Sequence, residues 1–395
     1  MLAPSVDAEA GRFVIIVAGE ASADLHGANL VKALHRRDPG LEFCGIGGRA
    51  MERAGVRLIA SSSEMAVVGL TEVLGRVRSI LGAAGRLKSL LRTRRPALLI
   101  LIDYPDFNIH MAGVAKRLDV PVLYYISPQV WAWRSGRVRK IARRVDRMAV
   151  ILPFEEAFYR KRGMRVDYVG HPLMDALPAT VDREAVAARL RVDPERCVVG
   201  LLPGSRREEI RNLLPVMIRA MERLSTEYPG LLGLLPLAPT ISPELVRSFV
   251  RASGVEIRVF RENVHAVLSL CRAALVASGT ATLDTAAMGV PMVVVYRVSP
   301  LSYRVARMVV RVSHISLVNL VAGEGAVPEL IQESVTPRRL ASELGLLLGD
   351  PSARRIMKDR LARVRARLGR GGASERTAEI AMEMMRDRAS SPAAS

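Results

Sequence analysis

Residues 197–212 read CVVGLLPGSRREEIRN, and this stretch decides the fold. Cys197 to Leu202 is a short apolar run with the length and β-branched content of a buried strand, and Pro203-Gly204-Ser205 breaks it before a helical pattern begins. The first N–H groups of such a helix lack intrahelical partners, so Ser205 and Arg206 would stand where an anion such as phosphate binds. The alternative is an ordinary strand-to-helix connection with Ser205 as the cap.

Apolar runs alternate with helical patterns through most of the chain, which is the rhythm of a parallel sheet covered by helices. The segment from His171 to Asp182 contains two prolines and separates two series of strands. We therefore predict an α/β fold with two doubly wound domains joined there. The expected strands are 13–18, 97–102, 120–126 and 148–152 in the first series, and 197–202, 231–235, 255–260, 273–277 and 291–296 in the second.

The composition favours an acidic partner. The chain has 58 Lys and Arg against 39 Asp and Glu, a formal net charge of +19, which predicts attraction to phosphates or to anionic lipid headgroups. Only 4% of the residues are aromatic, too few for a protein that stacks on bases. We therefore expect no nucleic-acid partner.

The three cysteines are far apart, each in or beside an apolar segment, and have no metal-ligand spacing, which is typical of reduced core thiols. The run at 13–18 is too short for the core of a signal peptide. The longest apolar runs fall far below the roughly 20 residues of a spanning helix. These patterns predict a cytoplasmic protein whose contact with a membrane is peripheral.

Polar residues follow the first predicted strand, at the edge where open parallel sheets bind ligands. The stretch 18–27 reads AGEASADLHG, and its Glu20, Ser22, Asp24 and His26 can reach a polar ligand. It does not match GxGxxG. The alternative is a helix start capped by Ser22 or Asp24.

Two carboxylates follow the strand at 97–102, in Asp103-Tyr104-Pro105-Asp106-Phe107-Asn108. Asp103 comes directly after the buried strand, so apolar neighbours would raise its pKa and fit it to take a proton from an attacking hydroxyl. Asp106 or Asn108 would instead cap the next helix.

Residues 124–134, YYISPQVWAWR, hold both tryptophans of an aromatic-poor chain. This cluster predicts a surface for a sugar or for a lipid boundary, and the alternative is a packed edge between domains. After the strand at 273–277, Ser278, Gly279 and Thr280 form a second candidate anion cradle, where Asp284 could accept hydrogen bonds from ribose hydroxyls.

Amphipathic helical patterns with basic faces occur at 65–95 and at 299–312, where they either cover a sheet or lie on anionic lipid. A third lies in the C-terminal region, with an apolar stripe of Met357, Leu361, Val364 and Leu368 among arginines. We expect Gly371-Gly372 to separate the last two helices and residues 351–388 to dock on the first domain.

Taken together, these motifs resemble the lipid-A-disaccharide synthases, inverting glycosyltransferases of the two-domain GT-B type. The resemblance spans nearly the whole chain and is carried by AGEASADLHGA (18–28), GIGG (45–48), GLTEVLGR (69–76), DYPDFN (103–108), YYISPQVWAWR (124–134), VGHPL (169–173), LLPGSRREEI (201–210), SGTATLD (278–284), PMVVVYR (291–297) and SLVNLVAG (316–323).

The resemblance implies two Rossmann-like domains facing a central cleft, with C-terminal helices crossing back to the first domain. It implies an acceptor and lipid-binding domain at 1–175, a UDP-sugar domain at 176–350, helices at 351–388 and a tail at 389–395. The implied reaction transfers 2,3-diacylglucosamine from its UDP donor to the 6-hydroxyl of 2,3-diacylglucosamine 1-phosphate, giving a β-1,6 disaccharide and UDP.

The resemblance also assigns residues. It makes Asp103 the general base. UDP would lie near Ser205, Arg206, Ser278, Gly279, Thr280, Asp284, Asn319 and Gln332. The acceptor side would hold Glu20, Ser22, Asp24, His26, Glu72, Asn108, Trp131 and Arg134. Fixed cations would replace a metal, so neither a metal nor a cofactor is expected.

The resemblance permits a homodimer through the C-terminal helices and a place on the anionic inner membrane. Three positions depart from the usual pattern: Ala23 stands for glycine, Tyr104 for a small residue, and Asp284 for the glutamate of many GT-B proteins. The runner-up is another UDP-sugar enzyme of this fold, such as a UDP-N-acetylglucosamine 2-epimerase. A dinucleotide oxidoreductase is disfavoured because GxGxxG is absent after the first strand.

Overall fold

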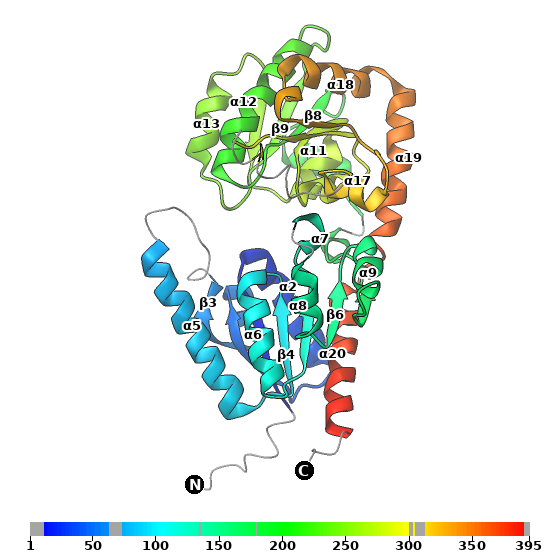
Figure 1. The fold of residues 1–395 in the computed structure, drawn as a ribbon. Coiled ribbons are helices and arrows are strands. Elements are labelled where there is room, and N and C mark those ends of the chain that lie inside the picture. Colours follow the sequence, from blue (N-terminus) through cyan, green and yellow to red (C-terminus); the bar gives the residue numbers. More distant parts are fainter. Residues whose placement is uncertain are drawn as a thin grey trace. The chain divides into compact units, whose positions relative to one another are not determined.

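The computed structural model describes residues 12–62, 73–133, 136–178, 180–299, 303–304 and 313–390. The chain forms two compact units (Figure 1). Unit 1 comprises Met1–Asp175 and Arg370–Ser395, and unit 2 comprises Ala176–Gly369. No helix in the described part of the chain is both long and apolar enough to cross a bilayer.

The described residues of unit 1 contain a parallel sheet with the strand order β3-β2-β1-β4-β5-β6-β7. Because β1 is the first strand and β4 lies beside it on the other side from β2, the order reverses between β1 and β4. The strands are β1 (Phe13–Ala18), β2 (Glu42–Gly47), β3 (Val56–Ser61), β4 (Leu98–Ile102), β5 (Val122–Tyr125), β6 (Arg147–Val150) and β7 (Val166–Tyr168).

Both faces of this sheet are covered. Alternate residues of β1 enter two different core clusters: Ile15 packs on one face and Ile16 on the other. A strand buried on both sides needs apolar residues at every position, which explains the uninterrupted run. The helices are α2 (Ala21–Arg37), α3 (Arg49–Arg53), α5 (Val73–Arg94), α6 (Pro105–Arg117), α7 (Val130–Trp133), α8 (Arg137–Ala142), α9 (Pro153–Arg160), α10 (Leu173–Ala176), which spans the unit boundary, and α20 (Ala373–Ser390).

Unit 2 repeats the plan with the order β10-β9-β8-β11-β12-β13, which reverses between β8 and β11. Its strands are β8 (Val198–Leu202), β9 (Leu232–Pro236), β10 (Glu256–Phe260), β11 (Ala273–Ala277), β12 (Met292–Tyr296) and β13 (Glu329–Ile331). Its helical segments are α11 (Arg183–Arg189), α12 (Arg207–Leu224), α13 (Pro243–Arg251), α14 (Val264–Leu270), α15 (Ala281–Ala287), α17 (Leu317–Ala322), η3 (Gln332–Ser334), α18 (Pro337–Gly349) and α19 (Pro351–Arg367).

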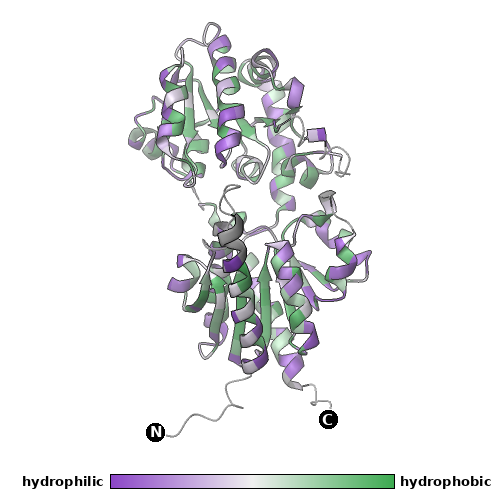
Figure 2. Cartoon of the chain, turned by 60° about the vertical axis from the view of Figure 1, so that its left-hand side comes forward, coloured by the Kyte–Doolittle hydropathy of each residue, from purple (hydrophilic) through white to green (hydrophobic). Residues whose placement is uncertain are grey.

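The predicted α/β class with two doubly wound sheets is confirmed. In Figure 2 the strands of both sheets are coloured as hydrophobic, and the helices carry hydrophilic residues on parts of their surface. The sequence did not predict β2, β3, β7 or β13. All four lie at or near a sheet edge, where positions such as Glu42 and Arg57 are exposed and the apolar run is interrupted.

The C-terminal helices divide between the units, which corrects one prediction. The apolar stripe of α19 buries Met357, Leu361 and Val364, and α19 contacts α15, α17 and α18 of unit 2. The backbone N–H of Met292, at the start of β12, points at the sulfur of Met357 at 3.3 Å. Residues 351–367 therefore extend unit 2 rather than docking on the first domain, because the helices of unit 2 supply the partner that the stripe needs.

Helix α20 packs on unit 1, against α2. Ala378, Ala381 and Met384 enter the same core cluster as Ile16 of β1. Arg37 of α2 pairs with Glu379 at 2.8 Å, and Arg147 of β6 pairs with Glu383 at 2.6 Å. Gly371 and Gly372 lie between α19 and α20, and Gly372 has a φ of +93°, a conformation that favours glycine.

Candidate active site

Both candidate half-sites lie where a strand order reverses, the position at which open α/β sheets bind ligands. In unit 1, Ala18 pairs with Ile102, so the residues that follow β1 and those that follow β4 meet at one edge. In unit 2, Leu202 pairs with Val276 and brings the segment 203–206 beside the segment 278–280. Stretches that are far apart in the sequence are therefore neighbours in each unit.

Asp103 is a partly buried carboxyl at the reversal point of unit 1. Burial and, after it, the negative charge of Glu20 together raise its pKa to about 6, against a hydrogen bond from the backbone of Tyr104 that lowers the pKa. Such a group is mostly ionised at neutral pH and is a stronger base than an ordinary aspartate. Asp103 therefore has the electrostatic setting of a general base.

The backbone at this point adopts an uncommon conformation. Asp103 and Tyr104 have φ values of 47° and 44°, in the left-handed region that few residues other than glycine occupy. The ring of Tyr104 covers Gly19, and a Cβ added at Gly19 would lie 2.4 Å from that ring. The tyrosine that departs from the family pattern thus requires a glycine at position 19.

Asn108 lies behind Asp103. Its side chain is fully buried, and its amide nitrogen donates to the carbonyl oxygens of Ile102 at 3.1 Å and Asp103 at 2.7 Å. Its burial leaves no exposed side-chain atom for an acceptor in this structure, and the expected contact stays a prediction. The capping alternative is wrong, because α6 begins at Pro105 without a side-chain cap.

The segment after β1 separates into exposed and buried polar residues. Glu20 and Ser22 are exposed at the start of α2. Asp24 is buried, and its carboxylate accepts from the backbone N–H groups of Gly48 at 2.7 Å and of Ala50 and Met51 at 3.0 Å. Asp24 therefore holds the start of α3, which corrects both its expected ligand role and the suggestion that it caps α2.

The same contact explains why the GIGG motif has a glycine at position 48. A Cβ there would lie 2.6 Å from a carboxylate oxygen of Asp24. Ala23 lies inside α2, so this departure from glycine needs no left-handed backbone.

His26 is half-buried, and burial lowers its pKa while Asp175 opposes the change. His171 is buried, and burial together with nearby His26 lowers its pKa to about 4. One of its ring nitrogens accepts from the backbone N–H of Leu173 at 3.1 Å. The motif VGHPL predicted no role for His171. The position of His171 just after the strand β7 is the feature of the sequence that could have indicated one.

Trp131 is anchored by a buried carboxyl group. Its indole N–H donates to Glu155 at 3.0 Å, and the hydroxyl of Ser127 donates to the same oxygen at 2.6 Å. Glu155 is 1% exposed, and burial raises its pKa to about 7 against these hydrogen bonds. The ring of Phe154 meets Trp131 edge to face at 4.8 Å. The family resemblance includes the motif PFE at 153–155 but gave Glu155 no role, although this residue follows β6 at the expected ligand-binding edge.

At the start of α12 in unit 2, the carboxylate of Glu209 binds backbone N–H groups of the same helix start. Glu209 accepts from the backbone N–H groups of Ser205 at 2.9 Å and Arg206 at 3.1 Å. Gly204 has a φ of +114°, and a Cβ there would collide with Glu209. In this structure Glu209 therefore takes the backbone donors that were expected to receive phosphate, and phosphate binding at Ser205 and Arg206 stays a prediction.

Side chains remain for an anion at this point. The side chain of Arg206 is 83% exposed and lies 3.7 Å from Glu209, so it can turn toward a ligand. Ser205 is exposed as well. The contribution of Arg206 is thus a mobile positive charge at the reversal point.

The second predicted cradle follows β11. Ser278 uses its N–H on the carbonyl of Val295 at 2.9 Å and its hydroxyl on that of Ile315 at 3.2 Å. Gly279 has open space where a Cβ would stand, and Thr280 is exposed. A ligand can approach the backbone at Gly279 and Thr280, while the N–H and hydroxyl of Ser278 bond to neighbouring backbone segments.

Asp284 is held by a histidine that the sequence did not identify. His265 of α14 lies 2.8 Å from a carboxylate oxygen of Asp284 and is 5% exposed. The carboxylate itself is 18% exposed. This pair fixes the shorter aspartate side chain in one direction at the first turn of α15.

Asn319 and Gln332 are structural in unit 2. The amide of Asn319 is buried and bonds to the backbone of Val327 and to Glu329, all at 2.9 to 3.0 Å. The amide of Gln332 is buried and bonds both backbone groups of Val298. Both side chains bond within unit 2 in the structure, and their contact with UDP stays a prediction.

Glu329 connects Asn319 with the segment Ile315-Ser316 through hydrogen bonds. It accepts from the backbone of Ile315 at 3.0 Å, and from the backbone of Ser316 at 2.9 Å and its hydroxyl at 2.5 Å. The expected site residues Glu72 and Arg134 lie outside the described residues, as do most of 299–312 and the start of 65–95.

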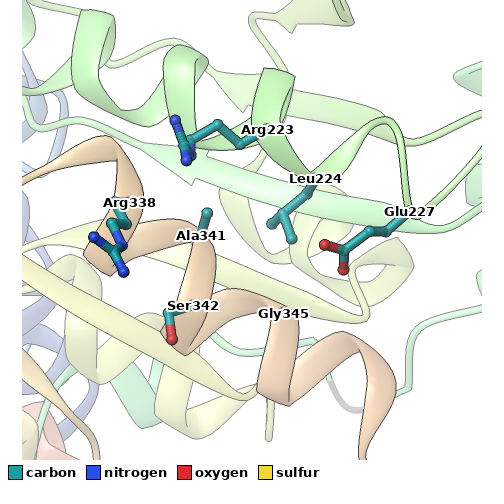
Figure 3. Close-up of a pocket in the computed structure, with 7 residues that line it drawn as sticks. All are labelled: Arg223, Leu224, Glu227, Arg338, Ala341, Ser342 and Gly345. Carbon is teal, nitrogen blue, oxygen red and sulfur yellow. The ribbon is translucent and has the colours of Figure 1, made fainter.

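Within the described ranges, no group of three or more His, Cys, Asp or Glu residues is placed to hold a metal ion. Figure 3 shows a groove between α12 and α18. Arg223, Leu224 and Glu227 line one side and Arg338, Ala341, Ser342 and Gly345 the other. Because α12 starts at the carboxyl end of β8, its last turn lies toward the opposite edge of the sheet. The groove is therefore separate from the candidate half-site.

Solved structures with this architecture define the class. The calicheamicin glycosyltransferase CalG4 aligns with a TM-score of 0.62 over 96% of this chain and 99% of its own, at 16% identity. A UDP-GlcNAc 2-epimerase from Neisseria meningitidis, solved with UDP-GlcNAc, aligns with a TM-score of 0.65 over 94% and 100%, at 12% identity. The chain has the two-domain GT-B fold.

Sequence comparison gives the family. The family model described as lipid-A-disaccharide synthetase matches residues 14–384. The lipid-A-disaccharide synthase of Geobacter metallireducens is 54% identical over 94% of this chain and 97% of its own length. That of Geobacter sulfurreducens is 50% identical over the same shares. The chain belongs to the lipid-A-disaccharide synthase family.

Proposed function

We propose that the chain transfers 2,3-diacylglucosamine from its UDP donor to the 6-hydroxyl of 2,3-diacylglucosamine 1-phosphate, forming the β-1,6 disaccharide 1-phosphate and releasing UDP. The observation that carries the proposal is the match to the family across residues 14–384, with relatives about half identical over nearly their full length. The chemistry of the two half-sites supports it independently.

Unit 1 supplies the base. Asp103 takes the proton from the acceptor 6-hydroxyl as the oxygen attacks the anomeric carbon, and its raised pKa makes that transfer more favourable. The attack comes from the face opposite the leaving group, which gives inversion at the anomeric carbon. Glu20 and Ser22 are exposed in the segment that follows β1, and in this proposal they bind the sugar hydroxyls.

Unit 2 stabilises the leaving group. Charge accumulates on the diphosphate as the bond to the anomeric carbon breaks, and Arg206 with the backbone at Gly279 and Thr280 offsets that charge. Asp284, held by His265, accepts from the ribose hydroxyls. We propose that this cationic arrangement replaces a divalent metal and that no cofactor takes part.

The test is product analysis with UDP-2,3-diacylglucosamine and 2,3-diacylglucosamine 1-phosphate, with and without excess EDTA. The expected products are the β-1,6 disaccharide 1-phosphate and one equivalent of UDP, in equal amount with EDTA. A requirement for added divalent metal would overturn the metal-independent mechanism alone. Epimerised UDP-sugar without disaccharide would instead identify a 2-epimerase.

The substrates bring the enzyme to a membrane surface, and we propose that it binds there from the cytoplasmic side. On α5, Ala83, Leu87 and Leu91 are buried against the sheet, so this helix covers the core. Its outer face exposes Arg78, Arg86, Arg92 and Leu81. A basic face with an exposed leucine suits anionic lipid. A homodimer through α19 and α20 remains part of the proposal, and analytical ultracentrifugation of the full chain tests it.

A further inference from the structure

Asp103 is held from both sides of its own peptide backbone. Its carbonyl oxygen accepts the hydroxyl of Tyr124 at 2.5 Å and the amide nitrogen of Asn108 at 2.7 Å. Its N–H donates to the carbonyl of Ile126 at 3.3 Å. The residue is therefore bonded to β5 through Tyr124, to Ile126 just after β5, and to α6 through Asn108.

These contacts surround a concentration of unfavourable backbone conformations. Asp103, Tyr104 and Ile126 have φ values of 47°, 44° and 62°. For a β-branched residue such as Ile126, this region is a genuine outlier. Strain of this kind persists only where the surroundings hold it, and it concentrates at functional sites. The hydrogen bonds to Asp103 are the local contacts that hold it.

Asn108 also carries a cost that packing alone does not explain. It is fully buried, and its side-chain oxygen has no hydrogen-bond partner among the described residues. Turning the amide over would place that oxygen against the carbonyl oxygens of Ile102 and Asp103, so the present orientation is the one that chemistry allows. A buried polar atom without a partner is unfavourable. The amide nitrogen of the same side chain donates two hydrogen bonds, to the carbonyl oxygens of Ile102 and Asp103.

We propose that Tyr124 and Asn108 are positioning residues for Asp103: their hydrogen bonds to its carbonyl fix the left-handed backbone that presents the carboxylate beside Glu20 at the reversal point of the sheet. Without them the strained peptide relaxes and the carboxylate shifts. A displacement of about 1 Å at a reacting group can cost about 100-fold in rate. The inference rests on the proposed role of Asp103 as general base.

The experiment uses the full-length enzyme and the isosteric variant Tyr124→Phe, which removes only the hydroxyl, together with Asn108→Leu, which removes the donors at similar volume. Tyr125→Phe is the matched control, because Tyr125 is the next residue of β5, is equally buried and packs in the core cluster on the opposite face. The readouts are kcat, the affinity for UDP, the pH profile of kcat/KM and the melting temperature.

We expect Tyr124→Phe and Asn108→Leu to lower kcat by about 10- to 100-fold. UDP affinity should stay within about twofold, and the acidic limb of the pH profile should move. Tyr125→Phe should retain its kcat and its acidic limb. Combined with Asp103→Asn, Tyr124→Phe should cause no further loss, because residues that act through one group are not additive.

Two results would overturn the inference alone: equal kcat for Tyr124→Phe, Asn108→Leu and Tyr125→Phe, or the same fold loss from Tyr124→Phe with and without Asp103. Full activity of Asp103→Asn itself would instead remove the proposed general base. If one of the two variants fails to fold, the other decides the question.

Discussion

Asp103 shows how much a single residue depends on its surroundings. An aspartate after an apolar strand is easy to find in the sequence, but its pKa of about 6 comes from burial and from Glu20, which is 83 positions away and adjacent only in the fold. We predict that Asp103→Asn lowers kcat by about 10²- to 10⁴-fold, the usual contribution of a general base. UDP affinity should stay nearly unchanged.

The raised pKa of Asp103 also predicts how kcat/KM changes with pH. The base acts when it is deprotonated, so kcat/KM of the unmodified enzyme should fall as the pH drops through about 6. Steady-state kinetics between pH 5 and 8 and calorimetry with UDP are the measurements. Asp106→Asn is the control, since Asp106 is exposed and pairs with Arg137 at 2.7 Å. Parallel losses of UDP binding and turnover in Asp103→Asn would contradict its assignment.

Arg206 gives a second residue-scale prediction. Its exposed side chain is proposed to contact the diphosphate, and hydrogen bonds to charged groups contribute about 1.5–3 kcal/mol. Arg206→Ala should therefore weaken UDP binding by about 10- to 100-fold and lower turnover with it. Arg219→Ala, an exposed arginine farther along α12, should behave as the unmodified enzyme. Unchanged UDP affinity in Arg206→Ala would place the phosphate elsewhere.

Glu155 gives a prediction about stability. Its pKa in the folded protein is raised to about 7 from 4.5, so between these values the folded state binds more protons than the unfolded state. Stability contributed by this group is therefore present at low pH and lost as pH rises toward 7. Glu155→Gln should flatten the fall in melting temperature between pH 5 and pH 7.5.

The exposed Glu52 provides the control for that measurement, because Glu52→Gln should leave the pH dependence as it is. An equal pH dependence in Glu155→Gln and the unmodified protein would show that Glu155 does not titrate in this range.

At the scale of elements, α20 completes unit 1 although it comes last in the chain. We predict that a chain ending at Gly369 loses the fold of unit 1, because the core cluster of β1 would be left uncovered. Met384→Ala removes one buried side chain and should cost about 2–5 kcal/mol of unfolding free energy.

Arg386→Ala is the matched control on the exposed side of the same helix. Solubility, circular dichroism and thermal unfolding decide the outcome. A soluble, folded and active protein ending at Gly369 would show that α20 is dispensable.

The start of α12 shows the limit of local reasoning about elements. The motif PGSRREE predicts the strand, the turn and the helix correctly. It does not reveal that Glu209 takes the two N–H groups that an external anion was expected to use. An internal carboxylate and a phosphate satisfy the same donors, so only the coordinates distinguish them.

At the scale of the whole molecule, the excess of positive charge predicts binding to anionic bilayers, and no helix in the part of the chain that the structure describes could span one. The full chain should sediment with vesicles containing an anionic phospholipid at low salt and be released at high salt, since screening removes surface attraction. Neutral vesicles are the control. A combined Arg78→Ser, Arg86→Ser and Arg92→Ser variant on α5 should bind more weakly, because each basic residue near the surface contributes about 1 kcal/mol.

Equal sedimentation of that variant and the unmodified protein would show that α5 is not the lipid-binding face. Sedimentation that persists at high salt would point to burial of apolar residues rather than to charge.

The sequence by itself determined the α/β class, the two doubly wound domains, the family and the position of Asp103. Those features depend on local patterns: strands buried on both faces need apolar residues at each position, and turns at their ends need glycine and polar residues. The strands β2, β3, β7 and β13, which lie at or next to a sheet edge, lack such runs and were missed for that reason.

The tertiary structure alone decided which polar side chains bond within the protein and which are exposed. Asp24, Asn108, Asn319 and Gln332 have the chemistry of binding residues, but in the structure their side chains bond to backbone groups, which lie 24 and 34 positions away for Asp24 and Gln332 and within eight positions for Asn108 and Asn319. It also divided the C-terminal helices, giving α19 to unit 2 and α20 to unit 1. The physical reason is the same in each case. The sequence shows that a polar group needs a hydrogen-bond partner or that an apolar stripe needs to be buried, but only the folded chain determines which partner is close enough.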